Sequence, residues 1–323
     1  MVTLYIIAGI YVLIVNFSDI PEMFRLIVVS AFTTSEASGA FIGGSVGTAF
    51  MFGTKRAIFS NEAGQGSSPI VHAAVKTNEP AREGIIAGIE PLIDTIVVCT
   101  FTALIILSTG IWDRNVDVQF SAPPKIINQG DTWSFSDTLH TNKSGKKGDP
   151  VIMHVIADFN KVTGQYIHKV PGKIISKHNS LEIKWDDFRS SQKPKIHSKG
   201  YYFDYVGATL TAKAFDAVNV GLGKWLITIA SWFFAISTIM AWGYYGEQGL
   251  IYLFGEKSVF AYRITYCSLI FIATLGFIET SVDLDNLSGI GLGIIVYANL
   301  PICWIFGYRA INTYKEYIKN ERA

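Results

Sequence analysis

The sequence predicts an all-α polytopic membrane protein that carries a small β-rich soluble domain. Half of its 323 residues are hydrophobic and only 16% are charged, below the roughly 25% of an average soluble domain. The charged residues are concentrated between 113 and 205, whereas both ends of the chain are apolar. We therefore expect membrane helices in 1–112, a soluble β domain in 113–205, and membrane helices with a cytoplasmic tail in 206–323.

Four apolar stretches are long enough for a membrane helix, which needs about 20 residues. They are residues 84–111, 224–246, 259–278 and 287–308. The shorter stretch 3–17 is expected to end a span whose beginning is absent, so the chain looks truncated, and 16–36 is expected to form a loop. Lys and Arg near helix ends mark cytoplasmic loops. Their distribution favours six crossings, with both chain ends inside and residues 113–205 outside.

Alternating apolar and polar residues predict strands in the insert, in the runs VIMHVIADFNKVTGQYIHKV, LEIKW and YYFDYV. Five of the six histidines also lie there: His140, His154, His168, His178 and His197. Their spacing matches no metal-ligand motif, so we expect ordinary solvated histidines and no metal other than sodium.

The segment SGAFIGGSVGTAF, from Ser38 to Phe50, concentrates four glycines in an expected membrane span. Such glycines can allow close helix packing. Alternatively, they mark a broken helix whose free N–H and C=O groups bind a carboxylate or a sodium ion. The density of glycines favours the broken helix.

Glu90 and Asp94 lie four residues apart and therefore on one helix face, with Pro91 between them. A carboxyl at bilayer depth is costly and faces the protein interior or a cavity by default. It could couple an ion or act in gating. Equally, it could bond backbone groups that Pro91 or the neighbouring broken helix leaves free. The two readings are balanced for Asp94, and the structural reading is favoured for Glu90.

Ser237 and Thr238 lie at the middle of the span 224–246, with Trp242 one turn further on. Hydroxyl and carbonyl oxygens suit a hard cation such as sodium, and the indole could wall a small apolar pocket. From this segment alone, hydroxyls bonded to their own helix and a Trp at the membrane interface are the better explanation.

Enzymatic and nucleic-acid-binding functions have little support. The glycine-rich stretch KRAIFSNEAGQGSSPIVHAA lacks the GK[ST] ending of a phosphate loop. The net charge is only +1.

Several stretches resemble the sodium:alanine (alanine or glycine:cation) symporter family: GTKRAIFSNEAGQGSSPIVHAAVKTNEPAREG, IEPLIDTIVVCTFTALIILSTGIW, GATLTAKAF and FFAISTIMAWGYYGE. The resemblance covers residues 1–112 and about 207–250 well. It implies part of the leucine-transporter-type inverted-repeat fold, with the end of core helix five and helices six to ten. The family's first repeat and its GTGN-type segment are absent, and the insert stands where a short linker is usual.

The resemblance also implies a function and a site. We expect sodium-coupled symport of a small neutral amino acid, alanine or glycine, across a bacterial-type inner membrane, with no cofactor and with half of the site missing from this chain. The substrate residues would be Phe41, Gly43, Gly44, Ser45, Thr238 and Trp242. The sodium or coupling residues would be Ser237, Thr238 and Asp94. Two alternatives stay open: a membrane sensor that binds its ligand through the insert, and a transporter of the same fold with another substrate or a proton couple.

Overall fold

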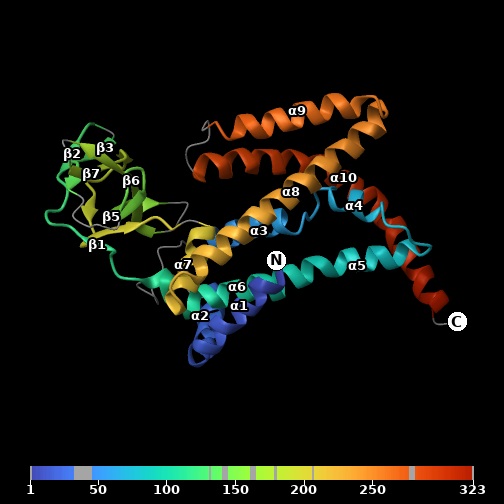
Figure 1. Cartoon of the computed structure of the whole chain (residues 1–323), viewed down its shortest axis with the longest axis horizontal. Helices are drawn as coiled ribbons and strands as arrows, with labels where there is room; N and C mark the ends of the chain where they lie inside the picture. The colour runs from blue at the N-terminus through green and yellow to red at the C-terminus, as the bar shows by residue number, and fades with distance from the viewer. Residues whose placement is uncertain are drawn as a thin grey trace. The chain divides into compact units, whose positions relative to one another are not determined.

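The structure, a computed structural model, describes residues 2–32, 46–130, 132–139, 145–160, 165–177, 180–205, 207–275 and 281–321 (Figure 1). It divides into two compact units. The first comprises residues 1–10, 52–103 and 224–323, and the second comprises residues 11–51 and 104–223. The proposed broken-helix residues Phe41, Gly43, Gly44 and Ser45 lie outside the described part of the chain.

Helices form most of the chain on both sides of a β region. The described helices are α1 (Val2–Val15), η1 (Phe17–Asp19), α2 (Ile20–Phe32), α3 (Val46–Ser60), α4 (Ser68–His72), α5 (Pro80–Leu92), η3 (Ile93–Val98), α6 (Cys99–Ser108), η4 (Ile111–Asp113), α7 (Ala208–Val218), α8 (Leu222–Phe254), α9 (Ser258–Ala273) and α10 (Ser281–Glu321). Within this set, η3 is a π-helical segment that joins α5 to α6 without a break.

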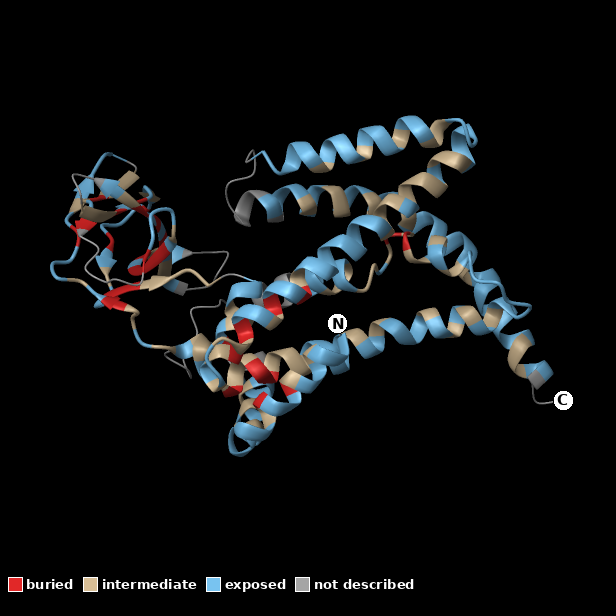
Figure 2. Ribbon diagram, viewed as in Figure 1, coloured by how far each residue is buried: buried red, intermediate tan, exposed pale blue. Residues whose placement is uncertain are grey.

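Among the described residues, three helical stretches are long and apolar enough to cross a membrane: Pro80–Ser108, Leu222–Phe254 and Asn286–Asn320. They contain or overlap the predicted spans 84–111, 224–246 and 287–308, and large apolar side chains along them are exposed (Figure 2). An apolar surface of this size needs lipid or a partner to cover it. The chain is therefore a membrane-embedded helical protein.

Two predicted segments differ from the structure. The loop expected at 16–36 is wrong, because Ile20–Phe32 is helix α2. Pro21 lies in its first turn, where the missing N–H costs nothing, and Arg25 bonds Glu22 one turn earlier at 2.8 Å. Helices α1 and α2 form a pair bent by 78°, which would make a fourth span if counted as one. The apolar stretch predicted at 259–278 forms α9, which ends at Ala273.

All described strands lie between Val118 and Phe203, and they confirm the β-rich character predicted for this stretch. They are β1 (Val118–Gln119), β2 (Ile126–Asn128), β3 (Thr132–Phe135), β4 (Thr138–Leu139), β5 (Pro150–Asn160), β6 (Gln165–Lys177), β7 (Ser180–Trp185), β8 (Phe188–Arg189), β9 (Lys195–Ile196) and β10 (Gly200–Phe203). Strands β5 and β6 form the long antiparallel pair predicted from VIMHVIADFNKVTGQYIHKV.

The strands form two sheets with one apolar core. The larger sheet has the order β1-β10-β5-β6-β7-β4, with β9 added to β5, and the smaller has the order β2-β3-β8. Alternate residues of the central strands point inward, as the period of two requires. The buried core residues are Val118, Phe135, Val151, Met153, Val155, Val170, Ile174, Ile183, Trp185 and Tyr201. The β region thus closes a hydrophobic core with its own side chains.

One hydrogen bond inside this core is open to a direct test. Trp185 Nε1 donates to Thr138 Oγ1 at 3.0 Å, and both residues are buried. Thr138→Val keeps the side-chain shape but leaves the indole N–H without an acceptor, which costs about 1–3 kcal/mol. We expect the loss to appear as faster amide exchange in β6 and β7, measured by mass spectrometry on the full chain.

The matched control is Thr132→Val, at the partly exposed start of β3. The free energy of opening that amide exchange reports should change by less than about 0.5 kcal/mol in this variant, as is usual for surface substitutions. Equal exchange in the two variants would contradict a stabilising role for the Thr138–Trp185 bond.

Candidate functional site

A tight polar loop, residues 61–67, follows α3 in the first unit. Glu62, Gly64 and Gly66 have positive φ angles of 50°, 74° and 80°, so the chain turns sharply three times within five residues. Glycine adopts this conformation freely, whereas Glu62 does so at a cost that its surroundings must offset. Gln65, only 3% exposed, closes the turn by donating from Nε2 to the Ile58 carbonyl at 2.6 Å.

The end of α3 and this loop are bonded to η3. The Ser60 hydroxyl donates to an Asp94 carboxylate oxygen, and Asn61 Nδ2 donates to Thr95 Oγ1 at 2.8 Å. Asp94 therefore takes a side-chain partner from α3, which neither sequence-based reading anticipated. The π-helical turn of η3 begins two residues after Pro91, whose ring removes one backbone donor from the helix.

The loop also contacts α8. Ser67 Oγ donates to Glu62 Oε2 at 2.6 Å, and Glu62 is hydrogen-bonded to the Tyr245 hydroxyl. Tyr245 packs edge-on against Trp242, with ring centroids 5.9 Å apart. Thr238, Trp242 and Tyr245 follow the i, i+4, i+7 spacing of one helix face. The face of α8 that carries the predicted site residues is thus the face next to the polar loop.

A second polar cluster surrounds His72 at the end of α4. Its Nδ1 lies 2.7 Å from Glu83 Oε1 and its Nε2 lies 3.4 Å from Glu90 Oε2. The hydrogen bond to Glu83 raises the pKa of His72, assisted by Glu90 and opposed by burial of the ring. The side chain of Glu90 is 69% exposed, and His72 is a partner that its sequence context does not indicate.

Helix α10 holds the loop from another side. Asn299 Nδ2 donates to the Gly64 carbonyl at 3.0 Å. A Cβ atom added at Gly66 would lie 2.8 Å from Asn299 Oδ1, which is closer than real Cβ contacts come. The loop therefore fits against α10 only because residue 66 has no side chain.

The sequence-predicted residues are placed as follows. Ser237 Oγ donates to its own helix at Phe234 O, at 2.9 Å, which is the back-bonding arrangement considered from the sequence. Thr238 is exposed on α8, while Trp242 and Asp94 are partly buried in α8 and η3. Asp94 is bonded to Ser60, the residue before the 61–67 loop, and Trp242 packs on Tyr245, which is bonded to Glu62 of that loop.

Sequence reasoning missed three residues that organise this site: Glu62, Tyr245 and Asn299. Asn299 sits in an otherwise apolar stretch, IVYANLPICW, and a lone amide there is a signal of the kind expected for a buried polar partner. Two buried side-chain oxygens of the loop, Asn61 Oδ1 and Gln65 Oε1, have no hydrogen-bond partner within the described residues. Each of these amide oxygens can accept a hydrogen bond from a further group at the loop.

Helices of this length and the polar loop bonded to them define the class of the chain as a multi-helix membrane protein. Residues 1–127 and 196–323 match the sequence profile of the sodium:alanine symporter family. The chain belongs to this family. The match omits 128–195, which holds β3 to β8.

Known relatives agree with this assignment. The chain is 30% identical over 271 residues to the sodium/alanine symporter AgcS of Methanococcus maripaludis, covering 84% of the chain and 40% of the relative. It is 27% identical over 322 residues to the sodium/proton-dependent alanine carrier protein of Bacillus sp. PS3, covering 98% and 54%. A shorter match, 42% over 107 residues, links it to the probable sodium/glutamine symporter GlnT of Bacillus subtilis, covering 33% and 22%. The chain thus spans about half or less of the length of these relatives.

The fit between Gly66 and α10 leads to a prediction. Gly66→Ala introduces a left-handed alanine, at a cost of roughly 1–2 kcal/mol, and also pushes Asn299 away. We expect a lower unfolding midpoint for the detergent-solubilised protein, measured by differential scanning fluorimetry.

Gly84→Ala is the matched control. No atom lies within 4 Å of a Cβ added at Gly84 in α5, and alanine is favoured over glycine inside a helix by roughly 0.5–1 kcal/mol. This variant should unfold at the same or a higher temperature. A Gly66→Ala protein as stable as the Gly84→Ala protein would contradict the close packing of the loop on α10.

Proposed function

We propose that this chain provides helices of a secondary transporter that couples entry of sodium to uptake of a small neutral amino acid, alanine or glycine. Membership of the sodium:alanine symporter family supports the reaction class. The names of its relatives, a sodium/alanine symporter and a sodium/proton-dependent alanine carrier, support the substrate. In the same proposal the fold is part of a leucine-transporter-type inverted repeat, with no catalytic residues and no cofactor.

The observation that carries the proposal is the α8 face formed by Thr238, Trp242 and Tyr245, which adjoins the 61–67 loop through the Tyr245–Glu62 bond. A partly buried indole beside hydroxyl groups forms a small wall with few charges, which suits a small apolar side chain. Residues Phe41, Gly43, Gly44 and Ser45 would complete the substrate site.

The chemistry of the hydroxyl groups favours a cation nearby. Ser237 directs its proton to the Phe234 carbonyl, which leaves the lone pairs of its oxygen available to a cation. Sodium is a hard cation that prefers oxygen ligands, and the hydroxyl group of Thr238, the next residue, provides a second oxygen. In the proposal Asp94 supplies negative charge for coupling, with its orientation fixed by Ser60.

We also propose a topology from the Lys and Arg distribution. The insert, residues 113–205, forms a separate domain on the outer face of a bacterial-type inner membrane, and the C-terminal tail lies in the cytoplasm. The membrane parts are residues 1–112 and 206–323.

Proton coupling is a second candidate. It is suggested by the name of the Bacillus sp. PS3 relative and by the cluster of His72 with Glu83 and Glu90, in which the hydrogen bond to Glu83 raises the pKa of His72. Replacing sodium by choline in the uptake buffer separates the two. Uptake that persists in choline would exclude obligatory sodium coupling.

The test of the main proposal is uptake of labelled alanine into proteoliposomes under an inward sodium gradient. Two preparations are compared: the 323-residue chain, and the same chain joined behind the N-terminal half of the Methanococcus relative. We expect uptake only in the joined protein, because the resemblance assigns half of the site to the first repeat. Uptake by neither preparation would contradict the proposal, and uptake by the short chain would contradict the shared site.

A single substitution tests the sodium site in the joined protein. Thr238→Val removes one oxygen and should raise the sodium concentration for half-maximal uptake about tenfold, equivalent to roughly 1.4 kcal/mol. The control Thr265→Val changes an exposed threonine of α9 whose hydroxyl donates to its own helix, at Ala261 O. An unchanged sodium requirement in Thr238→Val would remove Thr238 from the site.

A further inference from the structure

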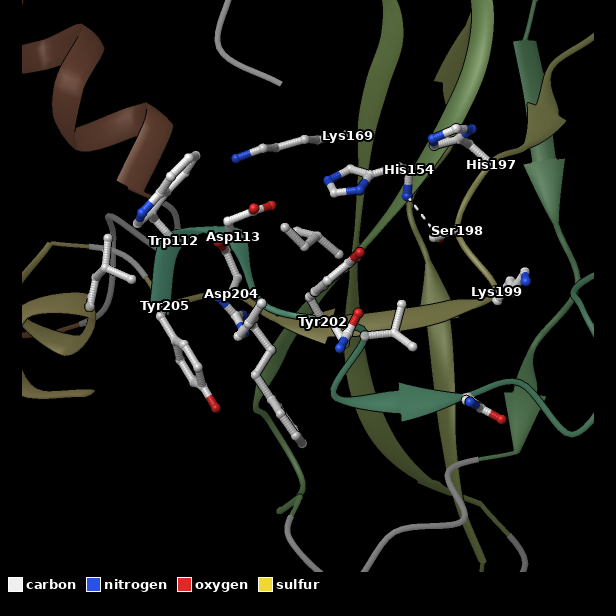
Figure 3. A pocket seen from close by; sticks show the side chains of 17 residues that line it. Trp112, Asp113, His154, Lys169, His197, Ser198, Lys199, Tyr202, Asp204 and Tyr205 are labelled. Carbon is white, nitrogen blue, oxygen red and sulfur yellow. Dashed lines mark hydrogen bonds between the residues drawn. The ribbon is translucent and has the colours of Figure 1, made fainter. Parts of the chain in front are cut away.

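The β region contains a cavity that the transport proposal does not use. It measures about 980 Å³ and lies where the chain enters and leaves the strands, between the segments 112–119 and 202–210 and strand β5. Figure 3 shows the side chains of Trp112, Asp113, His154 and Lys169 around one common space. A cavity of this size accommodates a small organic molecule.

His154 provides the first sign of a ligand. The residue is only 8% exposed, and its Nε2 atom has no hydrogen-bond partner among the described residues. In Figure 3 the ring edge points into the cavity. A buried polar atom without a partner costs about 1–3 kcal/mol, so an uncompensated nitrogen here calls for a binding partner.

The position of this ring is fixed by its neighbours. The Ser198 hydroxyl lies 3.2 Å from the His154 backbone nitrogen, and the His154 carbonyl accepts from the His197 backbone at 2.9 Å. The ring packs on Tyr202 with centroids 5.0 Å apart. Burial, with the nearby Lys169 and His197, lowers the pKa of His154 to about 4. The imidazole is therefore neutral at pH 7 and, with its proton on Nε2, is a preoriented donor.

The charges around the cavity are balanced but not paired. Two lysines, Lys169 and Lys199, and two carboxylates, Asp113 and Asp204, line it, and none of the four side chains forms an ion pair within the described part of the chain. Arg114 differs, because its guanidinium is already used by Asp117 and by the Phe203 carbonyl. A ligand with one charge could pair only with the lysines or only with the carboxylates, whereas a ligand with both charges could pair with one of each.

We propose that the cavity binds a small zwitterion, an α-amino acid with an apolar side chain. Its carboxylate accepts hydrogen bonds from Lys169 Nζ and from His154 Nε2–H, and its ammonium group lies against the Asp113 carboxylate. The side chain contacts the carbon surfaces of Trp112, whose indole N–H is bonded to Leu107 O, and of Ile152. This site is separate from the residues assigned to transport on α8.

Equilibrium dialysis with labelled L-leucine tests the site on the detergent-solubilised full chain. Choline replaces sodium in the buffer, so that a sodium-coupled site does not contribute. Two matched probes each lack one charge: 4-methylpentanoate lacks the ammonium group, and 3-methylbutylamine lacks the carboxylate. We expect leucine to bind saturably and each probe to bind at least tenfold more weakly. Equal binding of leucine and either probe would overturn the zwitterion assignment.

Variants place the binding in this cavity. Lys169→Met and Asp113→Asn should each weaken leucine binding at least tenfold, whereas Lys184→Met, at an exposed lysine of β7 away from the cavity, should leave it unchanged. Leucine should also slow amide exchange in residues 150–156 and 197–205 of the unmodified chain. Wild-type exchange in β6 would show that the variants are folded. Unchanged binding in both cavity variants, or no protection of these residues, would overturn the proposal.

Discussion

The hydrogen bonds of the polar loop, residues 61–67, and of Ser60 before it are the interactions that connect the helices of the first unit. The loop backbone adopts left-handed conformations at Glu62, Gly64 and Gly66, so the helix of α3 does not continue through the loop. Ser60 and Asn61 are hydrogen-bonded to η3. Glu62 is hydrogen-bonded to α8, and the Gly64 carbonyl accepts a hydrogen bond from α10. One short segment thus connects three helical elements of this unit.

These hydrogen bonds also orient α8. Tyr245 reaches Glu62, so the face that carries Thr238 and Trp242 is directed to the loop, while Tyr266 of α9 bonds the Ile239 carbonyl at 2.8 Å on another face. A helix held on two faces has little freedom to rotate about its axis. The position of Trp242 is therefore set by polar contacts made one turn further along the helix, and these contacts do not depend on the indole itself.

The elements that the sequence predicted well are those with a strong local pattern. The spans of α5–α6, α8 and α10 follow from apolar length, and the β5–β6 pair follows from alternation. Helix α2 was missed because its amphipathic sequence, IPEMFRLIVVSAF, has too little apolar length to indicate a span. The partners of Asp94 and Glu90 were also unpredictable: Ser60 and His72 lie 34 and 18 residues earlier, and only the folded loop brings them near.

The β region follows a different physical rule from the helices. Its core is closed by ten residues from its own strands, and Trp185 finds its hydrogen-bond acceptor, Thr138, inside that core. Within the described strands, the apolar side chains of this core pack against one another. The family profile matches the chain on both sides of 128–195. The additional segment is therefore joined to the matched sequence through a shared core, because Val118 of β1 and Tyr201 of β10 pack with the side chains of β3, β5, β6 and β7.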